Sequence, residues 1–395
     1  MSITRRDALK SGLLSLGGLS LLPHFGFAET WKKPVKIDAS GKAQYSPFFK
    51  EYLDEASLFA DEEILAKLNA NENPYGPSAK AIEAHQKGAM NGNRYAWREL
   101  FDLIDLIAKK EGVKSEQLMM GPGSSDILEK TGILMFLEGG NIVSADPSYM
   151  SMINVAEAVG AEWKGVPLKD DWSHDLDAME AAIDSETKLV YICNPNNPTG
   201  SLTDTEKLKR FCKRVSAKVP VFVDEAYLDF LDNPQSKSMV PLISDSHNII
   251  VARTFSKIHG MAGLRIGYMV SNEKTVKGFQ QITRGGMGIS YPSVMSALAS
   301  LEDQEFLKKS KKLNNETRDF VCAELKKMGF DYVPSFTSFV IFPIEFEGKE
   351  FLQKMRNQKV AVRAFEIHGK NWCRVSMGTR EEMELFLDAL KTVTA

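Results

Sequence analysis

The sequence is poor in the residues that bind metals and build disulfide frameworks. Its 395 residues include only four cysteines and six histidines. No two cysteines form a CxxC pair, and no histidines stand at the HExxH spacing of a zinc site. Three of the cysteines lie in apolar stretches, which favours buried free thiols over disulfides. We therefore expect no catalytic metal.

An excess of basic residues and long hydrophobic runs are also missing. The 49 Lys and Arg residues are balanced by 52 Asp and Glu residues, and the formal net charge is -3. Because phosphate contacts need a concentrated basic surface, this balance argues against a nucleic-acid partner. With 43% hydrophobic and 26% charged residues, the chain has globular composition and enough length for two domains. We expect small-molecule partners and no stable membrane association.

The first 28 residues resemble an export signal. Arg5 and Arg6 precede an apolar run from Leu13 to Leu22, and small residues flank a cleavage site after about Ala28. This pattern predicts a twin-arginine signal peptide and a periplasmic or exported protein. The run is too short and too rich in glycine and serine for a membrane anchor. If the leader is not used, the protein stays cytoplasmic.

The remaining chain predicts an α/β fold. Short β-branched runs alternate with helical patterns, as expected of a mostly parallel sheet covered on both faces. After about residue 300 the pattern changes to a long charged helix (Glu302 to Met328) with few strands, which predicts a separate, smaller α+β domain. We predict an N-terminal arm over residues 29–77, a large domain over 78–290 and a small C-terminal domain over 291–395. The predicted strands of the large sheet include Asn141–Ser144, Leu189–Cys193, Val219–Val223 and Ile249–Ala252.

Polar residues cluster where three predicted strands end. The segment Asn194 to Gly200 follows one strand, Asp224 to Tyr227 end the next, and Thr254 to Lys257 follow a third. Each segment alone has an ordinary explanation as a turn, a helix cap or a surface lysine. Carboxyl ends of parallel strands form one ligand-binding edge, so we expect the three segments to meet.

Together these residue types suit a pyridine aldehyde. The lysine amine can condense with the aldehyde, and the carboxylate can keep the ring nitrogen protonated so that the ring accepts carbanion electrons. The amide and the phenol can hold the ring oxygen. The set therefore predicts a pyridoxal phosphate (PLP) enzyme.

The sequence also resembles the fold-type I PLP enzymes of aminotransferase class I/II, and among them the histidinol-phosphate aminotransferase subfamily, over roughly residues 65–390. The resemblance implies a large domain with a mostly parallel seven-stranded sheet and a smaller α+β domain. The segments that carry it are Leu68–Pro74, Asn93–Tyr95, Gly121–Ser124, Asp146–Tyr149, Asn194–Gly200, Asp224–Tyr227, Thr254–Lys257, Ala262–Tyr268 and Arg374–Arg380.

The resemblance implies a role for each cofactor residue. Lys257 would form the internal aldimine and move the substrate proton, and Asp224 would pair with the ring nitrogen. Asn197 and Tyr227 would bind the ring oxygen, with Tyr227 also counted among the catalytic residues. Tyr149 would stack on the ring. The residues expected around the phosphate are Ser124, Ser125, Thr254, Ser256, Arg265 and, from the other subunit of a homodimer, Tyr95.

Three residues are expected to bind substrate. Arg374 corresponds to the arginine that grips the substrate carboxylate, a task that suits a planar guanidinium. Arg363 stands where the subfamily binds the distal phosphate, with a surface arginine as the alternative. Asn71 lies in the matching N-terminal segment.

The expected activity is transfer of an amino group to a 2-oxo acid. The donor would be an aromatic, imidazole or dicarboxylic L-amino acid, or histidinol phosphate. Export disfavours histidinol phosphate, since histidine biosynthesis is cytoplasmic. A PLP-dependent decarboxylase or lyase resembling phosphothreonine decarboxylase is the alternative, while an intact Lys257 and Asp224 argue against a binding-only relative.

Overall fold

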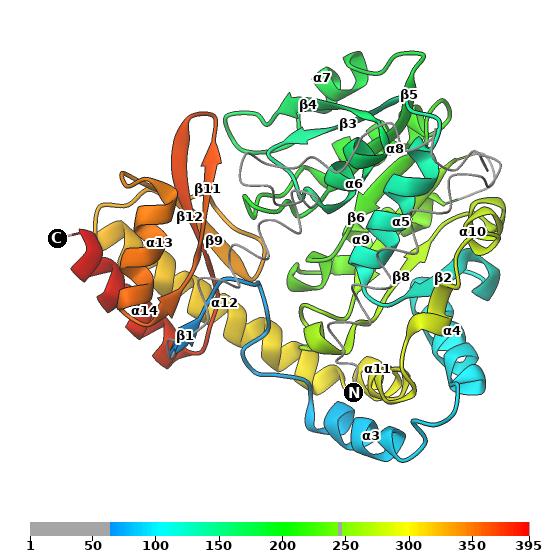
Figure 1. Ribbon diagram of the computed structural model, residues 1–395, viewed down its shortest axis with the longest axis horizontal. Coiled ribbons are helices and arrows are strands. Elements are labelled where there is room, and N and C mark those ends of the chain that lie inside the picture. Colours follow the sequence, from blue (N-terminus) through cyan, green and yellow to red (C-terminus); the bar gives the residue numbers. More distant parts are fainter. Residues whose placement is uncertain (1–63, 244–246, 395) are drawn as a thin grey trace, which may run out of the picture. The chain divides into compact units, whose positions relative to one another are not determined.

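A seven-stranded sheet forms the centre of the larger part of the protein (Figure 1). The structure, a computed structural model, describes residues 64–243 and 247–394. The strand order is β2-β8-β7-β6-β5-β3-β4, and only β8 runs against its neighbours. The predicted mostly parallel sheet is thereby confirmed. The strands are β2 (Leu118–Gly121), β3 (Asn141–Asp146), β4 (Glu162–Pro167), β5 (Thr187–Cys193), β6 (Val221–Asp224), β7 (Ile249–Thr254) and β8 (Gly267–Val270).

Helices cover both faces of this sheet. On one face, alternate strand residues such as Val223 and Val251 share a core with α4, α7, α8 and α11. On the other face, Phe222 and Ala252 share a core with α5, α6 and α10. The side-chain period of two explains why neighbouring strand residues enter different cores. The helices of this larger part are α3 (Ala79–Ala89), α4 (Trp97–Glu111), α5 (Ser124–Phe136), α6 (Ser151–Val159), α7 (Leu176–Ala181), α8 (Thr205–Val215), α9 (Pro234–Lys237), α10 (Glu273–Gln280) and α11 (Tyr291–Glu302).

A smaller α+β part has its own core. Its antiparallel sheet has the order β11-β12-β9, and a second, two-stranded sheet pairs β1 in parallel with β10. Figure 1 shows the blue strand β1 among the orange and red elements, so both ends of the described chain build this part. Its elements are β1 (Ala66–Lys67), α12 (Gln304–Lys327), β9 (Phe339–Ile344), α13 (Gly348–Asn357), β10 (Val360–Ala361), β11 (Arg363–Ile367), β12 (Lys370–Ser376) and α14 (Arg380–Thr394).

Asp303 separates helix α11 from helix α12. There α11 ends, and the Asp303 carboxylate caps α12 by accepting a hydrogen bond from the Phe306 N–H at 3.5 Å. Helix α11 packs against α3 and α4, and Val294 and Ala297 belong to the core of the large sheet. The helix predicted from Glu302 to Met328 is therefore α12. The division at residue 290 remains a prediction.

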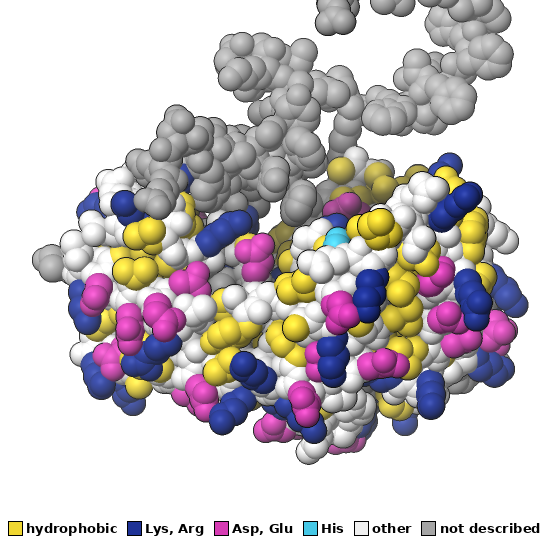
Figure 2. Space-filling view, turned by 90° about the horizontal axis from the view of Figure 1, so that it is seen from below, with side chains coloured by type: hydrophobic (Ala, Val, Ile, Leu, Met, Phe, Trp, Pro, Cys, Tyr) yellow, Lys and Arg dark blue, Asp and Glu magenta, His cyan; other side chains and the backbone are white. Residues whose placement is uncertain are grey.

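Three other features bear on the sequence predictions. All four cysteines are free thiols, as expected, and only Cys322 is not fully buried. None of the described helices is both long and apolar enough to cross a membrane. On the face seen in Figure 2, basic and acidic side chains are interspersed rather than gathered by sign. The predicted leader and residues 29–63 of the arm lie outside the described residues.

Candidate active site

The carboxyl ends of β5, β6 and β7 meet at one edge of the large sheet. The register sets Cys193 beside Asp224 and Asp224 beside Ala252, so the segments that follow these strands leave the sheet side by side. The loop 194–200, Asp224 and the segment 254–257 therefore lie at the same edge. In parallel sheets this edge is where ligands bind.

Asp224 is a carboxylate buried at this edge, with only 2% of its surface exposed. Its Oδ1 accepts a hydrogen bond from the Ala226 N–H at 3.0 Å, and its Oδ2 accepts one from the Tyr191 hydroxyl at 3.5 Å. Burial raises the pKa of Asp224 to about 6, although the Ala226 N–H and the Lys257 charge act in the opposite direction. A carboxylate in such a place is stabilised by a cation brought against it, such as a protonated pyridine nitrogen.

Lys257 follows β7 and lies close to Asp224. Its Nζ donates to the Asn71 carbonyl at 3.2 Å and lies 5.4 Å from the centre of the Tyr227 ring. Burial, and after it the positive charge of Arg374, lowers the pKa of Lys257 to about 8. A larger share of neutral amine at physiological pH makes this lysine a better nucleophile towards an aldehyde.

An anion-binding cradle lies where α5 begins. Gly123, with φ of 92°, precedes Ser124 and Ser125 in the first turn, where backbone N–H groups have no partner within the helix. A Cβ atom at Gly123 would lie 2.3 Å from Nη2 of Arg265. Glycine is therefore required for the arginine to lie directly against the start of the helix. The positive end of the helix and the guanidinium both favour a phosphate there.

Two hydroxyls extend the cradle from the end of β7. The Thr254 hydroxyl donates to Ser256 Oγ at 2.9 Å, and Arg265 Nη1 donates to the same oxygen at 3.5 Å. Arg265 also donates to the Ala262 carbonyl at 2.9 Å, which fixes its position. The five phosphate residues predicted within one chain thus converge from α5, β7 and the loop before β8.

The N-terminal segment is tied into the site through Asn71. Its Nδ2 donates to the Tyr227 hydroxyl at 2.9 Å. Its Oδ1 accepts from the Ser376 hydroxyl at 2.8 Å, and its backbone N–H donates to the same serine at 2.8 Å. Burial raises the pKa of Tyr227, which therefore stays a neutral phenol. Asn71 thus links the segment after β1, the large sheet and β12.

Arg374 is buried and firmly held. Its Nη1 donates to Asn197 Oδ1 at 2.7 Å, and its Nη2 donates to the Asn69 carbonyl at 3.2 Å. The guanidinium carbon lies 5.3 Å from the Phe339 ring and 5.2 Å from the Phe365 ring. Because Arg374 uses the amide oxygen of Asn197, the group that could reach a ring oxygen is the Asn197 amide nitrogen.

Arg363 lies beside Arg374 on the neighbouring strand. The two residues are direct partners in the β11–β12 register, so their side chains leave the same face of the small sheet. Arg363 is half-buried. Two adjacent guanidinium groups on one face can bind two anionic groups, or one anion and a ring that stacks on the second guanidinium.

The two remaining tyrosines lie differently. Tyr149 follows β3 and is close to Asp224; burial raises the pKa of Tyr149, while a hydrogen bond with the Ser125 side chain acts in the opposite direction. Tyr95 lies outside the cluster. It is 74% exposed, and its ring centre is 6.1 Å from that of Trp97. The structure thus brings together the predicted residues of one chain but not Tyr95.

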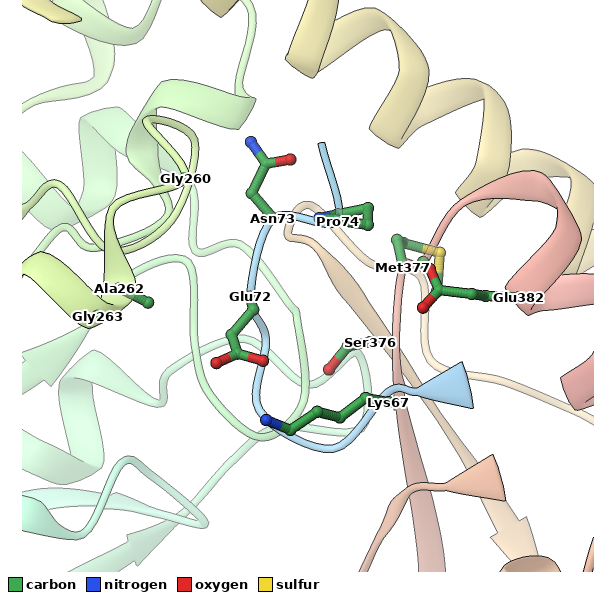
Figure 3. Close-up of a pocket in the computed structure, with 11 residues that line it drawn as sticks. Lys67, Glu72, Asn73, Pro74, Gly260, Ala262, Gly263, Ser376, Met377 and Glu382 are labelled. Carbon is green, nitrogen blue, oxygen red and sulfur yellow. The ribbon is translucent and has the colours of Figure 1, made fainter. Parts of the chain in front are cut away.

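A cavity of about 270 Å³ adjoins the Asn71–Ser376 hydrogen bonds. Lys67 and Glu72 both line this cavity, and Figure 3 shows them extending from the same blue N-terminal segment. Opposite them lies the loop that contains Gly260, three residues beyond Lys257. The cavity is large enough to hold a small polar molecule.

Sequence reasoning missed several residues around the predicted ones. Phe339 and Phe365 flank Arg374, and the Asn69 carbonyl accepts a hydrogen bond from it. The Ser376 hydroxyl donates to Asn71. Strand alternation offered one signal, since Ser376 stands two residues after Arg374 and so shares its face. The partners of Asp224 and Arg374 across the fold carry no local signal.

The donor set fits PLP. The cradle at α5 offers N–H groups, hydroxyls and a guanidinium to a phosphate. Arg265 lies so close to Gly123 that there is no room for a side chain at this position. Asp224 offers a buried carboxylate to a ring nitrogen, Tyr227 and Asn197 offer polar groups to a ring oxygen, and Lys257 offers an amine of lowered pKa.

Comparison with known proteins gives the same picture. The chain is 36% identical over 330 residues to histidinol-phosphate aminotransferase 1 of Bacillus cereus, which covers 83% of this chain and 88% of that protein. It is 34% identical over 331 residues to histidinol-phosphate aminotransferase of Moorella thermoacetica, covering 83% and 85%. The crystal structure of histidinol-phosphate aminotransferase from Sinorhizobium meliloti in complex with pyridoxal-5'-phosphate superimposes with a TM-score of 0.79 at 27% identity, covering 90% and 99%.

The family model "Aminotransferase class I and II" matches residues 63–390. This range contains every element of the site described above, from Asn71 to Ser376. The chain therefore belongs to the class I and II aminotransferases.

Proposed function

We propose that this protein, with PLP bound at the edge of the large sheet, transfers an amino group from an anionic amine substrate to a 2-oxo acid. The donor is histidinol phosphate or an L-amino acid with an aromatic, imidazole or dicarboxylic side chain. The observation that carries the proposal is the adjacent pair Arg374 and Arg363 on the face that also bears Phe365. One guanidinium binds the carboxylate or phosphate, and the other binds a second anion or a stacked ring.

Each residue has a task in this reaction. When bound, PLP supplies the aldehyde that accepts the amino group and the ring that accepts the electron pair from the substrate α carbon. Lys257 contributes its amine to the aldehyde and moves the proton at the α carbon. Asp224 holds the ring nitrogen protonated. Arg374 orients the substrate so that the bond to be broken faces Lys257.

A comparison of donors tests the substrate class. The protein lacking residues 1–28 would be assayed with histidinol phosphate, phenylalanine, tyrosine, histidine, aspartate, glutamate and, as a reference, alanine. We expect at least one charged or ring-bearing donor to exceed alanine clearly in kcat/KM. Arg363→Ala should reduce kcat/KM more for donors with a distal anion than for alanine. An equal reduction for all donors would remove Arg363 from the substrate site.

A decarboxylase or lyase is the second candidate and is not favoured, because the relatives above carry aminotransferase names. Release of carbon dioxide without formation of a keto acid would favour the decarboxylase over the aminotransferase. Measuring both products in the same reaction decides between the two activities.

We also propose that the protein is exported through the twin-arginine route. The support is Arg5 and Arg6 followed by a short apolar run. Replacing both arginines with lysine should leave the precursor in the cytoplasm. An unchanged periplasmic yield of the double variant would rule out this route. If the protein is exported, amino acids become better candidates than histidinol phosphate.

A further inference from the structure

A group of buried charges lies on the opposite face of the large sheet from the active site. Arg253, in β7, is 3% exposed. Its Nε lies 2.8 Å from a Glu225 carboxylate oxygen, and its Nη2 lies 3.5 Å from one of Glu111. Asp229 is further away, at 4.0 Å from Nη1. The side chains of Arg253, Glu225 and Glu111 are each no more than 4% exposed.

Hydrogen bonds fix these charges in place. Glu225 accepts from the Met239 N–H at 2.6 Å and from the Ser238 hydroxyl at 2.9 Å. The guanidinium of Arg253 donates to the same hydroxyl at 3.0 Å. Glu111, at the end of α4, accepts from the Tyr268 hydroxyl of β8 at 2.7 Å. The charges therefore connect β6, β7, β8, α4 and the segment 238–239.

Such a cluster is an unfavourable way to fill a core. Buried ion pairs pay for desolvation, and well-packed apolar residues in their place are often as stable or more so. On the same face of the sheet, the side chains two positions earlier are apolar, namely Val223 in β6 and Val251 in β7. The charged pair begins only at the carboxyl ends of β6 and β7. Stability of the fold alone gives no reason for the change from valine to charge at this point.

The location of the pair gives a reason. Glu225 directly follows Asp224, and Arg253 directly precedes Thr254, so each charge is bonded through one peptide unit to a residue at the site. The backbone joins the same two strands, since the Glu225 N–H donates to the Ala252 carbonyl at 3.0 Å. Asp224 and Thr254 serve opposite ends of PLP, the ring nitrogen and the phosphate.

We propose that Glu225 and Arg253 are positioning residues for the cofactor, acting from the far side of the sheet. The ion pair fixes the spacing and the relative rotation of the two strand ends, and so holds Asp224 and Thr254 at the separation that PLP requires. The proposal rests on PLP binding at this site. A loosened pair leaves the sheet intact but makes the two contacts difficult to form together.

A matched pair of variants tests the proposal. Glu225→Gln and Glu111→Gln each remove one buried carboxylate that contacts Arg253, but only Glu225 adjoins a cofactor residue. The melting temperature of each variant would be measured without and with saturating PLP, and the dissociation constant of PLP by absorbance titration. If Glu225→Gln does not fold, Arg253→Lys takes its place, because it keeps the charge and loses the planar contacts.

Without PLP, we expect both variants to have lower melting temperatures than the wild type. Glu111→Gln should gain the same increment from PLP as the wild type, whereas Glu225→Gln should gain less and bind PLP about tenfold more weakly. Equal increments and equal dissociation constants in the two variants would mean that the pair is only structural, and would overturn the proposal. If PLP does not stabilise the wild type, the proposed function fails instead.

Discussion

At the scale of single residues, the sharpest prediction concerns the loss of turnover when Lys257 is replaced. Because Lys257 offers both an amine to the cofactor aldehyde and a base at the α carbon, Lys257→Ala should reduce turnover by at least about 10³-fold. Borohydride reduction should attach PLP covalently to the peptide containing residue 257 in the wild type only. Mass spectrometry of the digested protein detects this adduct. A cofactor adduct at another lysine, with activity retained, would contradict the assignment.

Asp224 should give opposite effects on stability and on activity. Burial raises its pKa in the folded protein to about 6 from the ordinary value of 3.8, so the ionised form destabilises the cofactor-free protein. This destabilisation is absent below about pH 4, grows as the pH rises to about 6 and reaches its full size above about pH 6. Without PLP, Asp224→Asn should therefore be more stable than the wild type at pH 8, by on the order of 2 kcal/mol.

Urea unfolding at pH 4, 6 and 8 measures this difference, which should disappear at pH 4. In the same variant, transamination should fall by orders of magnitude, since an amide cannot hold the ring nitrogen protonated. Near-normal rates would remove Asp224 from the mechanism. A stability difference independent of pH would show that its carboxylate is not the cause.

At the scale of elements, the start of α5 depends on a glycine. Gly123→Ala places a Cβ 2.3 Å from Arg265 Nη2 in a backbone of positive φ, so Arg265 must move away from the phosphate cradle. Gly139→Ala is the matched control, because Gly139 also has positive φ but nothing within 4 Å of a Cβ. Both changes should lower stability by about 1 kcal/mol.

Only Gly123→Ala should weaken PLP binding, by about tenfold or more, as measured by fluorescence titration. Wild-type PLP dissociation constants in both alanine variants would show that the cradle does not bind the phosphate. A loss in both would point to backbone strain rather than to Arg265.

The elements themselves were predictable where their residues are distinctive. Runs of Val and Ile marked β3, β5, β6 and β7, since β-branched residues fit a buried strand. Strands β2 and β8 were not predicted, because Leu118–Gly121 and Gly267–Val270 are short and contain methionine and glycine. The helix predicted to begin at Glu302 begins at Gln304, and the N-cap role of Asp303 was not predicted, although an aspartate before a helical run is an ordinary N-cap.

The site was predictable to the extent that strand ends define it. Asp224 ends a buried strand, and Lys257 and Asn197 lie within a few residues after two others, so their meeting is a consequence of parallel topology. The partners that adjust them are not local. Arg374 is held by the Asn69 carbonyl, 305 residues away, and a backbone acceptor has no sequence signature. The ion pair of Arg253 and Glu225 likewise appears only when two strands are placed side by side.

At the scale of the whole molecule, the prediction concerns the number of subunits. We predict a homodimer in which Tyr95 of each subunit reaches the phosphate of the other. Tyr95 is well exposed and lies apart from the cradle of its own chain, as this role requires. Light scattering at assay concentration should give twice the mass of one chain.

Mixed dimers test the exchange of Tyr95. Lys257→Ala and Tyr95→Ala subunits, each poorly active alone, would be unfolded and refolded together. If Tyr95 acts across the interface, each hybrid has one intact site, and the mixture should recover about a quarter of wild-type activity. If Tyr95 acts within its own chain, no hybrid site is intact and activity stays at the level of the separate variants.

The pairing of β1 with β10, from near the two ends of the described chain, also orders events on the ribosome. The last strand of the large sheet ends at Val270, so this sheet can form while the rest of the chain is still being synthesised. Asn71 must wait for Ser376, 305 residues later, before its two hydrogen bonds to that residue can form. Contacts of such long sequence separation form late in folding. A nascent chain thus has the cofactor edge before it has the arginine that grips the substrate, and it becomes a complete enzyme only after almost its last residue has emerged.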